Sequence, residues 1–80
     1  MLNITITLDF NKYKKGTFDI AVDNEQLIKL CLKIVNESLN LNLNCEEINY
    51  CKSNREKRLI STECSFKENN IYTGDILEFV

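Results

Sequence analysis

The chain has 80 residues and a net charge of −2, and 44% of its residues are hydrophobic. This length allows one small hydrophobic core, so we expect a single domain over residues 1–80 without a deep active-site cavity. The longest uncharged run is too short to cross a bilayer, and the interspersed acids and bases argue against a nucleic-acid-binding surface as the main function. The first ten residues show neither a basic region nor a cleavage site, so we expect no signal peptide, no membrane insertion and a cytoplasmic protein.

Two strands are predicted at the start of the sequence. Residues 2–10 alternate strictly between apolar and polar side chains, which is typical of a half-buried strand. Residues 17–22 alternate again, with Phe18, Ile20 and Val22 expected to face inward. The polar loop between them carries Lys12, Lys14 and Lys15 and ends at Gly16, so we expect an antiparallel hairpin.

A single amphipathic helix is predicted from Asp23 to about Asn40. Its apolar residues recur every three or four positions and form one stripe: Ile28, Cys31, Leu32, Val35 and Leu39. Asp23 is suited to cap the first turn, with Gln26 three residues later as its partner. We expect this stripe to cover the inward face of the hairpin.

Three shorter strands are predicted in the second half, over residues 47–52, 58–61 and 76–80. Ile48 and Tyr50 are expected to share one side of the first of these, which leaves Asn49 and Cys51 on the outer side. Gly74 is the natural left-handed position of the turn before the last strand. The long connection allows the last strand to lie parallel beside the first. The prediction is an α+β fold of the β-grasp type, a mixed ββαββ(β) sheet curled around one helix.

No catalytic, metal or cofactor site is predicted. The chain has no histidine, and its cysteines lie at positions 31, 45, 51 and 64 without a CxxC pair, so their spacing does not fit a zinc site. We expect reduced cysteines, with Cys31 acting as a small apolar residue of the helix. No nucleophile stands beside a base in the sequence, which argues against acid–base or covalent catalysis.

Two motifs give the chain a family resemblance. The first is Tyr13 in the loop followed by Gly16-Thr17-Phe18-Asp19-Ile20, and the second runs from Ile71 through Gly74-Asp75 to Val80. With these motifs at this separation, the chain resembles the small bacterial ubiquitin-like proteins of the YukD/EsaB family along nearly its whole length. The resemblance implies a cytoplasmic accessory or regulatory protein of a Gram-positive type VII (WXG100-type) secretion system. Its partner would be a cytosolic domain of a membrane subunit.

Conjugation and sulfur transfer are not expected. Ubiquitin and the sulfur carriers act through a Gly-Gly tail, whereas this sequence ends at Val80 within the predicted last strand. Ubiquitin receptors bind an apolar patch on the third and last strands, and the expected outward residues Asn49 and Cys51 do not reproduce it. Two alternatives remain. One is a diverged modifier or sulfur carrier, and the other is a nucleic-acid-binding regulator that uses Lys12, Lys14 and Lys15.

The sequence therefore indicates a protein-binding module. Leu27, Leu30 and Ile34 form a second apolar stripe beside the buried one, and one hypothesis is a docking face on Leu30 and Ile34, used by a partner or in a homodimer. The alternative is that Leu27 packs at the core edge and that the other two contact the Leu41/Leu43 segment or are scattered surface residues. A second candidate face is the outer side of the last strand, Ile76 and Val80, beside Thr5 and Thr7.

Overall fold

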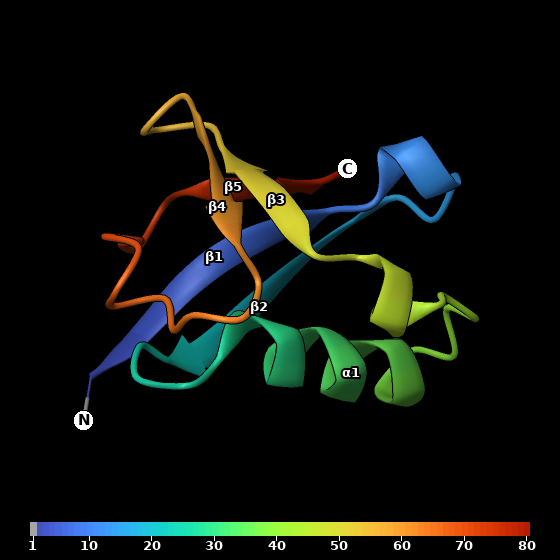
Figure 1. Cartoon of the computed structure of the whole chain (residues 1–80). Helices are drawn as coiled ribbons and strands as arrows, with labels where there is room; N and C mark the ends of the chain where they lie inside the picture. The colour runs from blue at the N-terminus through green and yellow to red at the C-terminus, as the bar shows by residue number, and fades with distance from the viewer. Residues whose placement is uncertain (1) are drawn as a thin grey trace.

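A computed structural model describes residues 2–80, and Met1 lies outside the described part of the chain. The strands are β1 (Asn3–Asp9), β2 (Thr17–Asp23), β3 (Tyr50–Ser53), β4 (Arg58–Ser61) and β5 (Ile76–Phe79). They form one sheet in the order β2-β1-β5-β3-β4. The α-helix α1 (Ile28–Ser38) lies against one face of this sheet (Figure 1). Two short 3₁₀ helices, η1 (Asn11–Tyr13) between β1 and β2 and η2 (Cys45–Glu47) between α1 and β3, lie on the right in Figure 1.

The strand pairing confirms the predicted β-grasp arrangement. β1 and β2 form the antiparallel hairpin, in which Ile6 lies opposite Ile20. β5 lies parallel to β1, with Leu8 opposite Leu77, and antiparallel to β3. The neighbouring strands β1 and β5 therefore come from opposite ends of the chain, as the blue and red ribbons of Figure 1 show.

The core lies between the sheet and α1 and follows from the alternation of the strands. Ile4, Ile6, Leu8 and Phe10 are almost fully buried, and the Phe10 ring stacks on Phe79 with centroids 4.8 Å apart. The helix contributes four residues of its predicted stripe, because Ile28, Cys31, Leu32 and Val35 are buried. The fifth, Leu39, follows the end of α1 and is 45% exposed, so its predicted burial is wrong. Phe66 and Ile71 anchor the connection before β5 and are buried as well.

The predicted start of the helix is wrong. The helix begins at Ile28 with Leu27 as its N-cap, and the Asp23 side chain instead accepts a hydrogen bond from the Glu25 amide at 3.0 Å within a turn. The first helical N–H groups are satisfied by another segment, because Ile28 donates to the Cys64 carbonyl at 3.0 Å and Lys29 donates to the Thr62 carbonyl at 2.8 Å. These tertiary hydrogen bonds replace the predicted side-chain cap.

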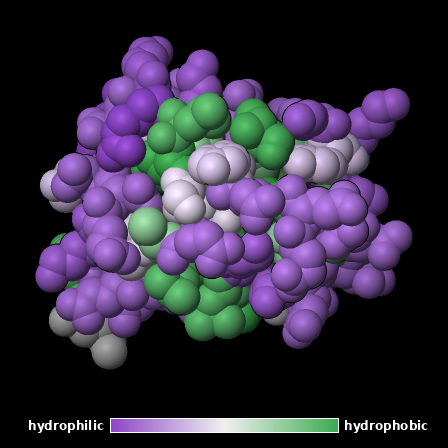
Figure 2. Space-filling model, viewed as in Figure 1, coloured by the Kyte–Doolittle hydropathy of each residue, from purple (hydrophilic) through white to green (hydrophobic). Residues whose placement is uncertain are grey.

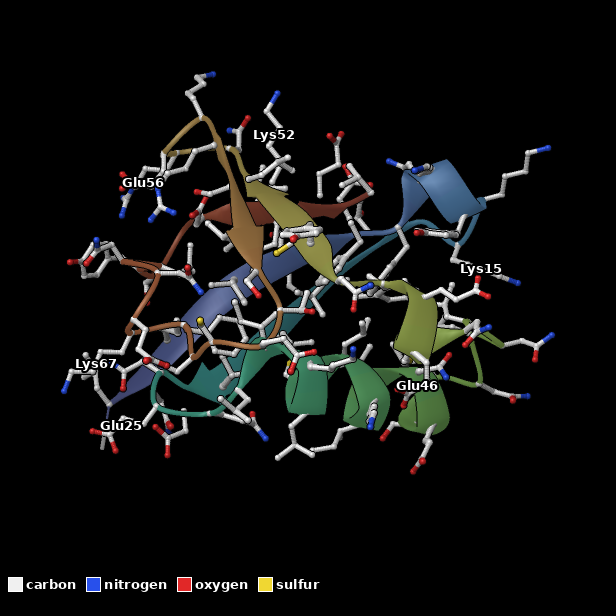
Figure 3. The ribbon with its side chains drawn as sticks, viewed as in Figure 1. Lys15, Glu25, Glu46, Lys52, Glu56 and Lys67 are labelled. Carbon is white, nitrogen blue, oxygen red and sulfur yellow. The ribbon has the colours of Figure 1, made fainter. Side chains whose placement is uncertain are left out.

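The predicted orientation of the third strand is also wrong. Cys51 is fully buried and faces the core, whereas Tyr50 is 55% exposed on the outer face. Ile48 is buried, but it lies before β3 and follows η2, which breaks the alternation assumed across residues 47–52. The outward residues of β3 are therefore Tyr50 and Lys52, and Figure 3 shows the Lys52 side chain pointing away from α1.

Candidate functional site

The helix α1 carries apolar side chains that the sheet does not cover. Leu30 is 48% exposed and Ile34 is 49% exposed, and the two lie one turn apart on the same side of the helix. Leu27 before the helix and Leu39 at its end are exposed to a similar extent. Figure 2 shows hydrophobic surface at the bottom of the molecule, where Figure 1 places α1. The predicted second apolar stripe is thus on the surface, and Leu27 is not packed into the core edge.

Ile34 forms part of an apolar groove between α1 and β2. The groove has a volume of about 310 Å³. β2 contributes Ile20, Ala21 and Val22, and the helical side contributes Cys31, Ile34 and Leu39. None of the residues that line the groove is charged, so a ligand would bind here by burial of apolar surface.

The groove exists because β2 is only partly covered by the helix. Val22 is 9% exposed, but Phe18 and Ile20 on the same face of β2 are only half-buried. Cys31 is 4% exposed, and burial raises the pKa of its thiol to about 11. The thiol is therefore neutral near pH 7 and acts as a small apolar side chain in the groove.

The predicted site residues fall on two separate surfaces. Ile34 lines the groove, and Leu30 extends the same apolar surface along α1 without lining the groove. Ile76 and Val80 lie on β5 and its end, on the face of the sheet that points away from the helix, and are 37% and 38% exposed. The structure places Leu30 and Ile34 one turn apart on α1, but it separates Ile76 from Val80 on the outer sheet face and does not join the two surfaces into one site.

The outer face of β5 is interrupted by charge. Lys52 lies opposite Glu78, and Glu78 lies opposite Asp9 on the other side, so a charged row separates Ile76 from Val80. Ile76 lines a hollow of about 240 Å³ with Asp9 and Lys52, whereas Val80 lines a different hollow with Lys12 and Lys15. Tyr50 and Lys52, in place of the predicted Asn49 and Cys51, are the outward residues of β3, and the row of Lys52, Glu78 and Asp9 still interrupts the apolar surface of this face.

Ile34 is the only groove residue that the sequence predicts as part of a site. Ile20 and Leu39 were both assigned to the core because each fits the inward pattern of its element. Their exposure follows from the edge position of β2 and from the end of α1 at Ser38, neither of which is visible in local periodicity. Two features of the sequence could have indicated the groove. β2 and the helix follow each other in sequence, and the helix carries more apolar residues than one buried stripe needs.

Within residues 2–80, no group of three or more His, Cys, Asp or Glu side chains is arranged to hold a metal ion. Nor does any helix in this part of the chain have the length and apolar character needed to cross a membrane. The free cysteines Cys31, Cys45 and Cys51 are buried, and Cys64 is partly exposed.

Comparisons with known proteins identify the fold. No protein-family model matches the sequence, and no curated protein gives a significant match. Among solved structures, the chain is similar to a de novo design based on ubiquitin, with a TM-score of 0.73, 18% identity, and coverage of 98% of this chain and 87% of the design. It is also similar to the C-terminal ubiquitin-like domain of mouse tubulin-specific chaperone e, with a TM-score of 0.70, 12% identity, and coverage of 96% and 84%. The chain has a ubiquitin-like fold.

Proposed function

We propose that the chain is a non-conjugated ubiquitin-like protein that acts by binding another protein through the groove between α1 and β2. The observation that carries this proposal is the continuous apolar surface formed by the groove and by Leu30 on the same helix. Apolar surface concentrated at one place, without charged side chains in its centre, is typical of the core of a protein interface.

The size of the molecule indicates how far the interface extends. A standard interface covers about 800 Å² on each partner, and the accessible surface of this chain is 4830 Å². An interface of that kind would cover roughly one sixth of the molecule. It therefore extends beyond the groove along the exposed side of α1, over Leu30 and over Leu27 just before the helix.

The resemblance to the YukD/EsaB family supplies the biological setting of the proposal. In that setting the chain is a cytoplasmic accessory protein of a type VII-like secretion system, and its partner is a cytosolic domain of a membrane subunit. The charged row formed by Lys52, Glu78 and Asp9 on the outer sheet face supports a partner other than a ubiquitin receptor.

A two-face binding experiment tests the proposal. The purified cytosolic domain of the membrane subunit is titrated with the wild-type chain, with a Leu30→Glu/Ile34→Glu variant, and with an Ile76→Glu/Val80→Glu variant. We expect the helix variant to lose binding by at least about tenfold, because charges at the centre of an apolar interface are desolvated without partners. The sheet variant serves as the matched control and is expected to bind like the wild type.

Three outcomes contradict the proposal. One is unchanged binding by the helix variant when its circular dichroism spectrum and thermal unfolding are those of a folded protein. Another is a set of partners that consists only of adenylating enzymes. The third is an intact mass from cells that shows a thiocarboxylate or a covalent conjugate. Sedimentation of the free chain identifies a homodimer, which the helix variant would dissociate if α1 formed its interface.

A further inference from the structure

Within residues 2–80, no strand pairs with the outer edge of β2. β2 is the terminal strand of the sheet, and it is seven residues long. The Phe10 amide donates to the Gly16 carbonyl at 2.8 Å, and the Asn24 amide donates to the Leu2 carbonyl at 2.8 Å, at the two ends of the β1–β2 ladder. Because hydrogen-bonded pairs alternate in an antiparallel ladder, the even-numbered residues of β2 bond to β1.

The odd-numbered residues of β2 therefore direct their backbone groups away from the sheet. These residues are Thr17, Asp19 and Ala21, and outside the ladder none of their N–H or C=O groups forms a hydrogen bond within residues 2–80. The edge also lacks proline, a common device that blocks strand addition. It offers a regular row of donors and acceptors to an extended segment.

The apolar groove opens directly at this edge. Ala21 lines the groove together with Ile20 and Val22, so the groove reaches the backbone of β2 on its free side. A strand added to a sheet lies about 4.8 Å from its neighbour, and its side chains alternate between the two faces. Every second side chain of an added strand would enter the groove against Ile34 and Leu39, and the others would face solvent.

The solvent-facing side of β2 is acidic. Asp19 and Asp23 lie on this side with Ala21 between them. Neither carboxylate takes part in an ion pair of the described residues, although Asp19 accepts a hydrogen bond from the Thr7 hydroxyl. Opposite charges at facing positions of neighbouring strands are favourable, so basic side chains are the matching residues on an added strand.

A second copy of this chain does not fit the same edge. Two β2 strands could pair antiparallel through their odd-numbered residues, which are Thr17, Asp19, Ala21 and Asp23. In every register that pairs at least three of these residues, an aspartate of one strand lies directly opposite or diagonal to an aspartate of the other strand. Like charges in these positions destabilise strand pairing. The charge pattern therefore favours a different chain.

We propose that the outer edge of β2 binds an extended segment of a partner protein as a sixth strand of the sheet. The five-residue pattern of this segment is basic, apolar, any, apolar, basic. The basic residues face Asp19 and Asp23, and the apolar residues enter the groove opposite Ile20 and Val22. This inference rests on the proposed protein-binding groove and adds the conformation and chemistry of the ligand.

A synthetic peptide tests the inference on the intact chain. The probe is a capped peptide in which Lys-Ile-Thr-Val-Lys is flanked by glycines, and its binding is followed by NMR titration. We expect shifts and slowed exchange at the Thr17, Asp19 and Ala21 amides. A peptide with glutamate in place of both lysines is expected to bind at least about tenfold more weakly.

Backbone and charge variants separate strand addition from other binding. N-methylation of the central threonine and its alternate neighbours removes the peptide's edge donors without changing the protein, and it is expected to weaken binding by at least about tenfold. An Asp19→Lys/Asp23→Lys variant is expected to prefer the glutamate peptide. Ala21→Pro is expected to abolish binding, and Leu59→Pro on β4 is the matched control at the opposite edge.

The inference is overturned if the lysine and glutamate peptides bind alike, if the N-methylated peptide binds as well as the parent, or if no peptide binds at millimolar concentration. Its failure is distinguishable from failure of the proposed function. A secretion subunit that loses binding to the Leu30→Glu/Ile34→Glu variant, but binds the Asp19→Lys/Asp23→Lys variant normally, supports a helix-docking partner and refutes strand addition.

Discussion

The two edges of the sheet differ in length and in what covers them. β2 at one edge has seven residues and an apolar groove beside it, whereas β4 at the other has four. Along β4, the Asn69 side chain donates to the Ser61 carbonyl at 3.4 Å, and Arg58 donates to the Asn69 carbonyl at 2.6 Å. The segment that leads to β5 thus occupies part of the β4 edge, and nothing comparable within residues 2–80 lies along β2.

This difference indicates which edge can accept a partner. Proteins avoid unwanted strand pairing by making edge strands short, covering them or charging them. β4 uses the first two devices, but β2 uses only charge, through Asp19 and Asp23. A charged edge repels another copy of itself while it remains open to a strand of opposite charge, so β2 is selective where β4 is blocked.

Hydrogen exchange gives the largest expected contrast. In the isolated chain, the Thr17, Asp19 and Ala21 amides are expected to exchange with almost no protection, whereas Ile6 and Ile20 exchange only through unfolding. The difference in protection between the two sets of amides corresponds to the global free energy of unfolding, which is roughly 4–12 kcal/mol for a chain of 80 residues. NMR-detected exchange measures it directly, and repetition at several protein concentrations controls for self-association. Equal protection of the odd- and even-numbered β2 amides would show that the edge is already covered.

Replacing Asp75 is expected to loosen the β4 side of the sheet. Asp75 is 2% exposed, and its carboxylate accepts hydrogen bonds from the Ser53 hydroxyl at 2.6 Å and from the Arg55 and Ile76 amides at 3.0 and 2.8 Å. Asp75→Ala leaves these donors without their acceptor, so we expect a loss of about 2–4 kcal/mol in urea unfolding. Local exchange protection should fall more at Ile60 than at Ile20. An equal fall at both would mean that the two sides of the sheet open together.

The sequence predicted the strands that are regular and missed the places where distant segments meet. β1, β2 and β5 follow from alternation, and the parallel β1–β5 contact follows from the length of the connection. The helix start at Ile28 depends on the carbonyls of Thr62 and Cys64, which lie more than thirty residues away and leave no local signal. The β3 orientation changed because η2 intervenes after a segment in which Asn40 and Asn42 adopt positive φ.

The candidate site was predictable only in part. Exposed Leu30 and Ile34 follow from the excess of apolar residues on α1. The groove required knowledge that β2 is an edge strand, which the sheet order decides and local patterns do not. For the same reason Ile20 and Leu39, which resemble core residues in sequence, are accessible in the fold.

Removing the Asn69 side chain is expected to open the β4 edge at a smaller cost. Asn69 is 9% exposed, and its amide group donates to the Ser65 carbonyl at 3.1 Å as well as to Ser61. Asn69→Ala leaves two carbonyls without this donor, so we expect a loss of about 1–2 kcal/mol in urea unfolding. Asn54→Ala in the β3–β4 turn is the matched control and is expected to stay within about 0.5 kcal/mol of the wild type. Wild-type stability of Asn69→Ala would indicate that water replaces the side chain and that the β4 edge is less closed than its contacts suggest.

The smallest expected effect compares two buried thiols of the core, Cys31 beside β2 and Cys51 on β3 next to β4. Burial raises the pKa of Cys31 beside the groove from 9.0 to about 11, and burial with the nearby Asp75 charge raises that of Cys51 from 9.0 to about 12. Since both values lie above that of the unfolded chain, each neutral thiol contributes stability that is fully present below pH 9 and is lost as the pH rises toward its folded value.

Cysteine replacement isolates the contribution of each thiol to the pH dependence of stability. Between pH 9 and 10 each thiol is expected to lower the unfolding free energy by at most about 1.4 kcal/mol. Cys31→Val and Cys51→Val should therefore each show a shallower decline than the wild type over this range, whatever their stability at pH 7. A Cys31→Val slope equal to that of the wild type, with a shallower Cys51→Val slope, would mean that the Cys31 thiol ionises in the folded chain. Water would then reach Cys31 through the groove. The difference between the open β2 edge and the covered β4 edge would in that case extend from the sheet edges into the core.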